Sequence, residues 1–229
     1  MDYFDKAETW DRATLETVQL ARLKTTIQQA GRAPFYAKRL AEAGVSADNL
    51  RSLEDIRRIP FTSKDDLRSQ YPYGLATVPH SEFVRMHCSS GTTGTPVAVC
   101  YTQPDINSWA DLMARCLYMA GVRKDDVFQN MSGYGLFTGG LGIHFGAERL
   151  GCMTIPAGAG NSKRQLKLVK DFGTTVAHIL PSYALHLGTT LIEEGEDPKA
   201  LSLRIACVGA EPYTEETRRR IEALFDMKV

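Results

Sequence analysis

The sequence contains no uninterrupted apolar run of about 18 residues, the length that a membrane-spanning helix needs. Its N-terminal stretch, MDYFDKAETWDRATLE, is polar and acidic where a signal peptide requires an apolar segment. We therefore expect a chain that does not span a membrane and that no signal peptide exports.

Excess charge of one sign and paired cysteines are also lacking. The chain has 229 residues, of which 27 are basic and 27 acidic, so its overall charge indicates neither nucleic acid nor a membrane surface as a partner. Its five cysteines are widely spread and include no CxxC pair, which argues against a disulfide framework and against a zinc site. A cytoplasmic location is expected, and these residues predict no metal site.

Apolar residues make up 43% of the chain, enough for one large domain or for one and a half average ones. Apolar residues recur at helical spacing over 9–30, before Gly31, and shorter helical patterns follow at 34–43 and from residue 62 or 63 to Pro72. We therefore predict a helical N-terminal segment over residues 1–79.

Beyond residue 79, strand and helix patterns alternate. Two alternating stretches flank a small-residue loop, at 84–88 and 97–101. Further strand candidates lie at 127–131, 152–156, 176–181 and 204–208, and helical patterns follow them, for example at 163–172 and 214–225. This rhythm predicts an α/β fold over 80–229, with a mainly parallel, doubly wound sheet that binds ligands at the carboxyl ends of its strands. Residues 227–229 resemble the start of another strand, so we expect a fragment of a longer protein.

The small-residue loop lies in the stretch HCSSGTTGTPVAV, residues 87–99. It consists of Ser89, Ser90, Gly91, Thr92, Thr93, Gly94 and Thr95. Its hydroxyl groups, and the main-chain N–H groups that glycine leaves accessible, are suited to phosphate oxygens. A flexible linker is the alternative, which the flanking strand patterns disfavour. The loop lacks the GxxxxGK[ST] and GxGxxG patterns, and the chain has no GxSxG serine-hydrolase motif.

SSGTTGTP resembles the phosphate loop of the AMP-forming adenylating enzymes, which include the acyl-CoA synthetases. Three further stretches, IPFTSKDDLRSQYPYGL, YGLFTGGLGIHFGAERLG at 134–151 and VGAEPYTEETRRRIE at 208–222, resemble the phenylacetate-CoA ligase family. The resemblance implies the large domain of an enzyme that uses ATP, Mg²⁺ and coenzyme A. Such an enzyme joins an aromatic acid, phenylacetate or a relative, to AMP and then transfers the acyl group to the coenzyme A thiol.

The resemblance also assigns residues. It implies that the loop Ser89–Thr95 holds the β and γ phosphates, and that Gly209, Ala210, Glu211 and Pro212 lie against the adenine. Without the resemblance, 209–212 reads as an ordinary turn from a strand into a helix that begins with proline.

The implied acyl pocket comprises Tyr134, Gly135, Phe137, Thr138, Gly139 and Gly140, with 157–160 closing its other side. Tyr134 and Phe137 can supply flat apolar walls while the glycines leave space for a ring. The alternative is a set of aromatic core residues above a glycine-rich helix start.

Other reactive side chains near these motifs receive no catalytic role. His87 lies beside the loop, on the strand face opposite to Val84, Met86 and Cys88, and Cys88 is expected to be structural. His144 faces the acyl pocket or packs inside a helix, and the sequence leaves both readings open.

The chain departs from the family in two ways. The lysine that the family usually has within or just after the loop is missing, which predicts a lower affinity for phosphate. The resemblance places the magnesium-binding acid, the ribose-binding acid and the lid domain with its adenylation lysine beyond Val229, so the catalytic residues stay unknown, and this stretch alone is expected to catalyse little.

Two alternative functions remain: an adenylating enzyme with another acyl acceptor, and a non-catalytic nucleotide-binding module. Family members commonly pair, so a homodimer is also implied.

Overall fold

The computed structural model describes residues 3–91 and 94–229. The chain divides into two compact units, Met1–Ile106 and Asn107–Val229. The sequence changes from helical to alternating patterns at residue 79, but the division into units falls inside helix α4 (Gln103–Met119). Unit 1 therefore contains the predicted helical segment and the strands on either side of the small-residue loop.

Unit 1 begins with helices whose ends agree with the sequence signals. The α-helices of this unit are α1 (Arg12–Ala30), α2 (Pro34–Glu42) and α3 (Lys64–Ser69). Its short 3₁₀ helices are η1 (Lys6–Thr9), η2 (Ala47–Asn49), η3 (Leu53–Arg58) and η4 (His80–Glu82). The side chain of Asp11 caps α1 by accepting a hydrogen bond from the Thr14 N–H, and Gly31 ends the helix. A small apolar core holds these elements together, formed by Ile27, Leu40, Val45 and Leu50.

An antiparallel hairpin completes unit 1. Strand β1 (Phe83–Cys88) pairs with β2 (Ala98–Thr102), so that Met86 lies opposite Cys100 and Cys88 opposite Ala98. The two predicted strands are thus confirmed, and the small-residue loop joins them.

Unit 2 is built on a four-stranded sheet in the order β4-β3-β5-β6, with every neighbouring pair parallel. The strands are β3 (Val127–Asn130), β4 (Met153–Ile155), β5 (Val176–Ile179) and β6 (Ile205–Val208). The helices that follow them are α5 (Thr138–Leu150), α6 (Ser162–Phe172), α7 (Pro181–Glu193) and α8 (Glu215–Phe225), with the short 3₁₀ helix η5 (Pro198–Ala200) before β6. The predicted parallel α/β fold is confirmed. Lys228 adds an isolated parallel bridge to Ile205.

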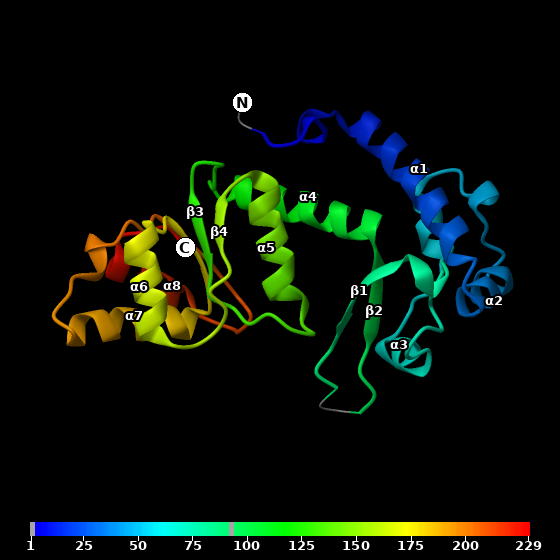
Figure 1. Ribbon diagram of the computed structural model, residues 1–229. Coiled ribbons are helices and arrows are strands. Elements are labelled where there is room, and N and C mark those ends of the chain that lie inside the picture. Colours follow the sequence, from blue (N-terminus) through cyan, green and yellow to red (C-terminus); the bar gives the residue numbers. More distant parts are fainter. Residues whose placement is uncertain (1–2, 92–93) are drawn as a thin grey trace. The chain divides into compact units, whose positions relative to one another are not determined.

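Helices cover both faces of this sheet, as a doubly wound fold requires. In Figure 1, α5 lies on one side of the sheet and α6, α7 and α8 lie on the other. The core divides accordingly: Phe128 and Val176 pack with residues of α4 and α5, whereas Ala177 and Ile179 pack with residues of α6, α7 and α8. Alternate residues of β5 therefore serve opposite cores, because successive side chains of a strand point to opposite faces.

The strand order places a topological switch at the middle of the sheet. The connection from β3 through α5 leads to β4 on one side, and the connection from β4 through α6 returns to β5 on the other side of β3. In open α/β sheets, ligands bind outside the carboxyl ends of the strands at such a switch. The expected ligand edge of unit 2 is therefore the end of the sheet formed by the residues after β3 and β5.

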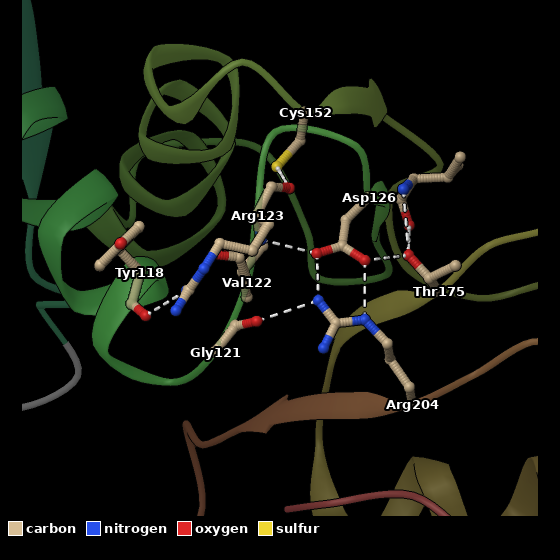
Figure 2. Close-up of polar contacts among 9 residues, drawn as sticks. Tyr118, Gly121, Val122, Arg123, Asp126, Cys152, Thr175 and Arg204 are labelled. Carbon is tan, nitrogen blue, oxygen red and sulfur yellow. Dashed lines mark hydrogen bonds and ion pairs between the residues drawn. The ribbon is translucent and has the colours of Figure 1, made fainter. Parts of the chain in front are cut away.

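The opposite, amino edge of the sheet is held by one buried carboxylate (Figure 2). Asp126, directly before β3, accepts hydrogen bonds from the Arg123 N–H at 2.7 Å, from the Thr175 hydroxyl at 2.7 Å and from Arg204 Nε at 2.8 Å. Thr175 and Arg204 directly precede β5 and β6. Burial alone would raise the pKa of Asp126, but the hydrogen bonds, led by those from Arg204, outweigh it and hold the pKa below its ordinary value. We call this group the Asp126 clamp.

Within residues 3–91 and 94–229, no helix combines the length and the apolar character that crossing a bilayer demands.

Candidate functional site

The small-residue loop of unit 1 is closed at its base by Ser89. The Ser89 N–H donates to the Val97 carbonyl at 2.9 Å, and the Ser89 hydroxyl accepts from the Val97 N–H at 2.9 Å. Inside the loop, the Gly94 N–H donates to the Gly91 carbonyl at 3.0 Å. Ser89 therefore holds the two strand ends together, which the sequence pattern did not distinguish from phosphate binding.

The described residues of the loop are largely exposed to solvent. Ser89, Ser90, Gly94 and Thr95 are exposed, whereas Gly91 is half-buried. Gly91 has a φ of +66°, and a Cβ there would lie 3.2 Å from the Gly94 carbonyl oxygen, so this turn needs glycine. Thr92 and Thr93, also assigned to the loop, lie outside the described residues. Ser90 and Thr95 are exposed residues whose hydroxyl groups a phosphate could reach, whereas the hydroxyl of the equally exposed Ser89 accepts from the Val97 N–H.

Beside the loop, His87 is buried and its ring meets that of Tyr101 edge-on, with the ring centroids 5.7 Å apart. Val84 and Met86, on the opposite strand face, are exposed. The alternation read from the sequence is therefore present, and the histidine occupies the more buried face.

The other three predicted segments, all in unit 2, lie at one edge of the sheet. Residues 134–140 follow β3, residues 157–160 follow β4, and residues 209–212 follow β6. All strands of the sheet are parallel, so their carboxyl ends share an edge, and it is the ligand edge defined above. The fold thus gathers segments that are up to about 75 residues apart in the sequence at the place where such sheets bind ligands.

Tyr134, the first aromatic residue after β3, is fixed by its hydroxyl group. Asn130 Nδ2 donates to Tyr134 Oη at 2.9 Å, and His144 Nδ1 lies 3.1 Å from the same oxygen. Burial raises the pKa of the Tyr134 phenol, so the group stays protonated at neutral pH. Of the two readings of His144, the structure gives a contact with the predicted pocket wall from a position on helix α5.

The remaining pocket residues divide into an open and a closed set. Phe137 is 60% exposed, and a Cβ at Gly135 or Gly139 would meet nothing within 4 Å, so these positions border open space. Thr138, also exposed, begins α5. Gly140 is different, because it is buried and a Cβ there would lie 2.3 Å from the Gly133 carbonyl oxygen. Its small size is needed for the packing of the chain on itself.

Residues 157–160 lie beside Tyr134, since a Cβ at Gly158 would be 4.0 Å from Tyr134 Cδ2. The loop is held from beneath by Gln165 of α6, whose Nε2 donates to the Gly158 carbonyl at 2.6 Å and to the Gly160 carbonyl at 3.2 Å. Gln165 is held in turn by Gln129 of β3, whose Nε2 donates to Gln165 Oε1 at 2.7 Å. Both glutamine side chains are fully buried.

The segment after β6 contains a strained residue. Ala210 has a φ of +70°, a left-handed conformation that costs a non-glycine residue about 1 kcal/mol or more. The adjacent Glu211 accepts a hydrogen bond from the Ser182 N–H at 2.6 Å, at the N-terminus of α7, and this bond lowers the pKa of Glu211. Gly209 is half-buried and Pro212 is exposed. The carboxylate of Glu211 thus serves a neighbouring helix, which leaves the main chain and small side chains of the segment to face a ligand.

Sequence reasoning missed Asn130 and His178, which lie side by side in the pairing of β3 with β5. His178 Nδ1 is 2.9 Å from Asn130 Oδ1 and 3.1 Å from the Ser132 hydroxyl. Burial lowers the pKa of His178 to about 4, so the ring is neutral at physiological pH. The available signal was the pair of amide side chains that ends the strand VFQN, because buried polar residues in a central strand are unusual.

The thiols of Cys152 and Cys207 are unreactive, and the described residues hold no cluster of metal ligands. Burial raises the pKa values of Cys152 and Cys207 to about 11, so both stay protonated, and Cys88 is half-buried. No three His, Cys, Asp or Glu side chains among these residues form a group that could hold a metal ion. The magnesium-binding acid that the resemblance implies is expected beyond Val229, outside this sequence.

The chain matches the family model described as AMP-binding enzyme over residues 15–229. It is 48% identical over 219 residues to a phenylacetate-coenzyme A ligase of Pseudomonas putida, and 46% identical over 223 residues to one of Thermus thermophilus. These alignments cover 95% and 97% of this chain but 50% of each relative, so the chain spans about half the length of the curated relatives it matches.

A solved structure of similar fold is 2-hydroxyisobutyryl-CoA ligase in complex with 2-HIB-AMP and CoA. It superposes with a TM-score of 0.89 at 33% identity, covering 96% of this chain and 49% of that one.

Proposed function

Because this chain belongs to the AMP-binding enzyme family, we propose that it is part of an AMP-forming acid–CoA ligase that acts on phenylacetate or a related aromatic acid. One observation carries the proposal: the segments after β3, β4 and β6 gather at the carboxyl edge of a doubly wound sheet. The phenylacetate-coenzyme A ligases similar to this chain support the substrate class.

In the proposed reaction, the carboxylate of the acid attacks the α-phosphorus of ATP and pyrophosphate leaves. The sulfur of coenzyme A then attacks the acyl carbon of the adenylate, and AMP leaves as the thiol gives up its proton. ATP and coenzyme A are thus substrates. Mg²⁺ would neutralise phosphate charge, but the described residues lack a ligand cluster for it, so we assign it no step.

The roles proposed for the chain are to bind and to orient. The tip of the small-residue loop, with Ser90 and Thr95, binds the β and γ phosphates through hydrogen bonds to charged oxygens. The strained turn at 209–212 offers main-chain groups to the adenine. Tyr134 and Phe137 form the apolar wall for the aryl ring, opposite 157–160.

Two finer points follow from the same proposal. The odd number and wide spacing of the five cysteines favour a reducing cytoplasm, in which we place the enzyme. A homodimer is proposed from the family resemblance alone.

Acid-dependent release of pyrophosphate by the full-length enzyme that carries this chain tests the proposal. Phenylacetate, benzoate, 2-hydroxyisobutyrate and a long-chain fatty acid are compared, and we expect the highest kcat/KM with phenylacetate. Release with the fatty acid alone contradicts the aromatic pocket, and release with 2-hydroxyisobutyrate alone reassigns the enzyme to small hydroxy acids, the class named for the similar solved ligase.

Adjacent serines provide a matched pair for the loop. Ser90→Ala removes an exposed hydroxyl, so we expect a KM for ATP that rises about fivefold with an unchanged free energy of unfolding. Ser89→Ala breaks the closure of the hairpin and is expected to lower the free energy of unfolding by about 1 kcal/mol. If Ser90→Ala lowers stability without changing the KM for ATP, the tip of the loop does not bind phosphate.

A further inference from the structure

The side chain of Asn130 is a fully buried junction at the ligand edge. Its Nδ2 donates to Tyr134 Oη at 2.9 Å and to the Gly140 carbonyl at 2.8 Å. Its Oδ1 accepts from the Ser132 N–H at 3.2 Å and lies 2.9 Å from His178 Nδ1. The Gly140 carbonyl can only accept and the Ser132 N–H can only donate, so these two contacts fix which amide atom is oxygen.

This orientation determines the direction of the next hydrogen bonds. Tyr134 Oη accepts from Asn130, so the phenol proton is available to His144 Nδ1, 3.1 Å away. An imidazole that accepts at Nδ1 carries its proton on Nε2, and His144 Nε2 lies 3.2 Å from Glu148 Oε1. The result is a directed chain from Asn130 through Tyr134 and His144 to a carboxylate that is half exposed.

Asn130 also sets the opposite wall of the pocket. The main-chain carbonyl oxygen of Asn130 accepts from the Gly158 N–H at 3.0 Å, and Gly158 lies against the Tyr134 ring. The end of β3 therefore fixes both walls, because the Asn130 side chain holds the hydroxyl of Tyr134 and the Asn130 main chain holds the loop beside it.

We propose that Asn130 and His144 are positioning residues for the acyl pocket. They occupy both hydrogen-bonding capacities of the Tyr134 hydroxyl and hold the ring so that its carbon face meets the aryl group of the bound acid. This inference rests on the proposed function. In this arrangement the hydroxyl of Tyr134 anchors the side chain through its hydrogen bonds, and the ring of Tyr134 is the surface that selects an apolar acyl group.

Kinetics of the full-length enzyme test the tether. In Tyr134→Phe and in His144→Leu, we expect the KM for phenylacetate to rise about fivefold, the size of one lost hydrogen bond, while the KM for ATP and for coenzyme A stays unchanged. The double variant should be no worse than either single variant, because both remove the same bond. His144→Asn, which offers an amide oxygen near the position of Nδ1, should restore part of the affinity.

A second histidine gives the matched control. His186 is exposed on α7 and its ring stacks on Tyr183 at 5.9 Å, so His186→Leu removes a similar aromatic pair that has no link to Asn130. We expect wild-type KM values from this variant. A separate readout is the ¹⁵N spectrum of His144, which should show the Nε2–H tautomer in the wild type and a tautomer mixture in Tyr134→Phe.

The outcomes are distinguishable. Three results with an active enzyme contradict this inference alone. The variants keep the wild-type KM for the acid, they raise the KM values for acid, ATP and coenzyme A alike, or their effects add in the double variant. An Nδ1–H tautomer in the wild type also contradicts it. An enzyme that releases no pyrophosphate with any acid contradicts the proposed function, and this inference with it.

Discussion

The two edges of the sheet in unit 2 are stabilised by different chemistry. The amino edge depends on an ion pair, in which the buried Asp126 carboxylate meets the Arg204 guanidinium. At the carboxyl edge the fully buried side chains that fix the loops are neutral, the amides of Asn130, Gln129 and Gln165, whereas the charged Arg164 and Glu211 there are not buried. The buried ion pair of this sheet therefore lies at the edge opposite to the proposed ligand edge.

A physical reason favours this division. A carboxylic acid, ATP and an acyl adenylate are anions, and a buried carboxylate beneath them would repel them through a medium of low dielectric constant. Neutral amides fix loops equally well because they both donate and accept hydrogen bonds. The comparison predicts that damage at the amino edge costs stability, whereas damage at the carboxyl edge costs affinity for the acid.

The largest expected effect is the loss of the Asp126 clamp. Asp126→Ala removes hydrogen bonds to Arg123, Thr175 and Arg204, and we expect the free energy of unfolding to fall by about 3 kcal/mol. Denaturant titration measures this change. Asp125→Ala, one residue earlier and exposed, is the control and should stay within about 0.5 kcal/mol of the wild type. The KM for the acid should be unaffected in both, and a rise in Asp126→Ala would break the comparison.

The same clamp predicts a dependence on pH. The pKa of Asp126 is lower in the folded chain than its unfolded value of about 3.9, so the unfolded chain binds the proton first as the pH falls. The stability that the ionised carboxylate supplies is therefore complete above about pH 5, and it is lost as the pH falls below about 4 and through the folded pKa. The stability difference between the wild type and Asp126→Asn should shrink over this range, and a difference that does not shrink as the pH falls from neutral contradicts the assignment.

A smaller effect on stability is expected at the carboxyl edge. Gln165→Leu keeps the bulk of the side chain but removes the donors to the Gly158 and Gly160 carbonyls, so we expect a loss of about 2 kcal/mol. The KM for phenylacetate should rise about fivefold in addition, because one wall of the pocket loses its support. Lys163→Gln, exposed on the same helix, is the control. Equal KM values for Gln165→Leu and the wild type would show that 157–160 is not part of the pocket.

The smallest effect concerns the strained turn. Ala210→Gly relieves a left-handed alanine, and we expect the free energy of unfolding to rise by about 0.5 kcal/mol after the entropy cost of glycine. If the KM for ATP rises at the same time, the strain preorganises the turn for the nucleotide. A loss of stability in this variant would show that the turn is unstrained.

The elements of unit 2 could be predicted because their signals are local. Strands β3, β5 and β6 are short apolar runs, and helices α6 and α8 have the predicted periodicity, so their bounds agree with the sequence to within two residues. Short loops between alternating strands and helices then leave little choice but a parallel sheet.

The side-chain network could not be predicted, since it depends on register. Asn130 and His178 are 48 residues apart and meet because β3 and β5 pair directly, with β4 on the far side of β3. Nothing local in the sequence specifies that order. The closure of the hairpin by Ser89 could not be predicted either, because it depends on the strand pairing that brings Val97 opposite Ser89.

The central claim is that the carboxyl edge of the sheet binds the acyl adenylate. A crystal structure of the full-length enzyme with a non-hydrolysable acyl-adenylate analogue tests it most directly. We expect the aryl group against the ring face of Tyr134 and the adenine against 209–212, with the Tyr134 hydroxyl still bonded to Asn130 and His144. An analogue bound beside Asp126 and Arg204, or one that takes the Tyr134 hydroxyl as its own hydrogen-bond partner, would contradict it.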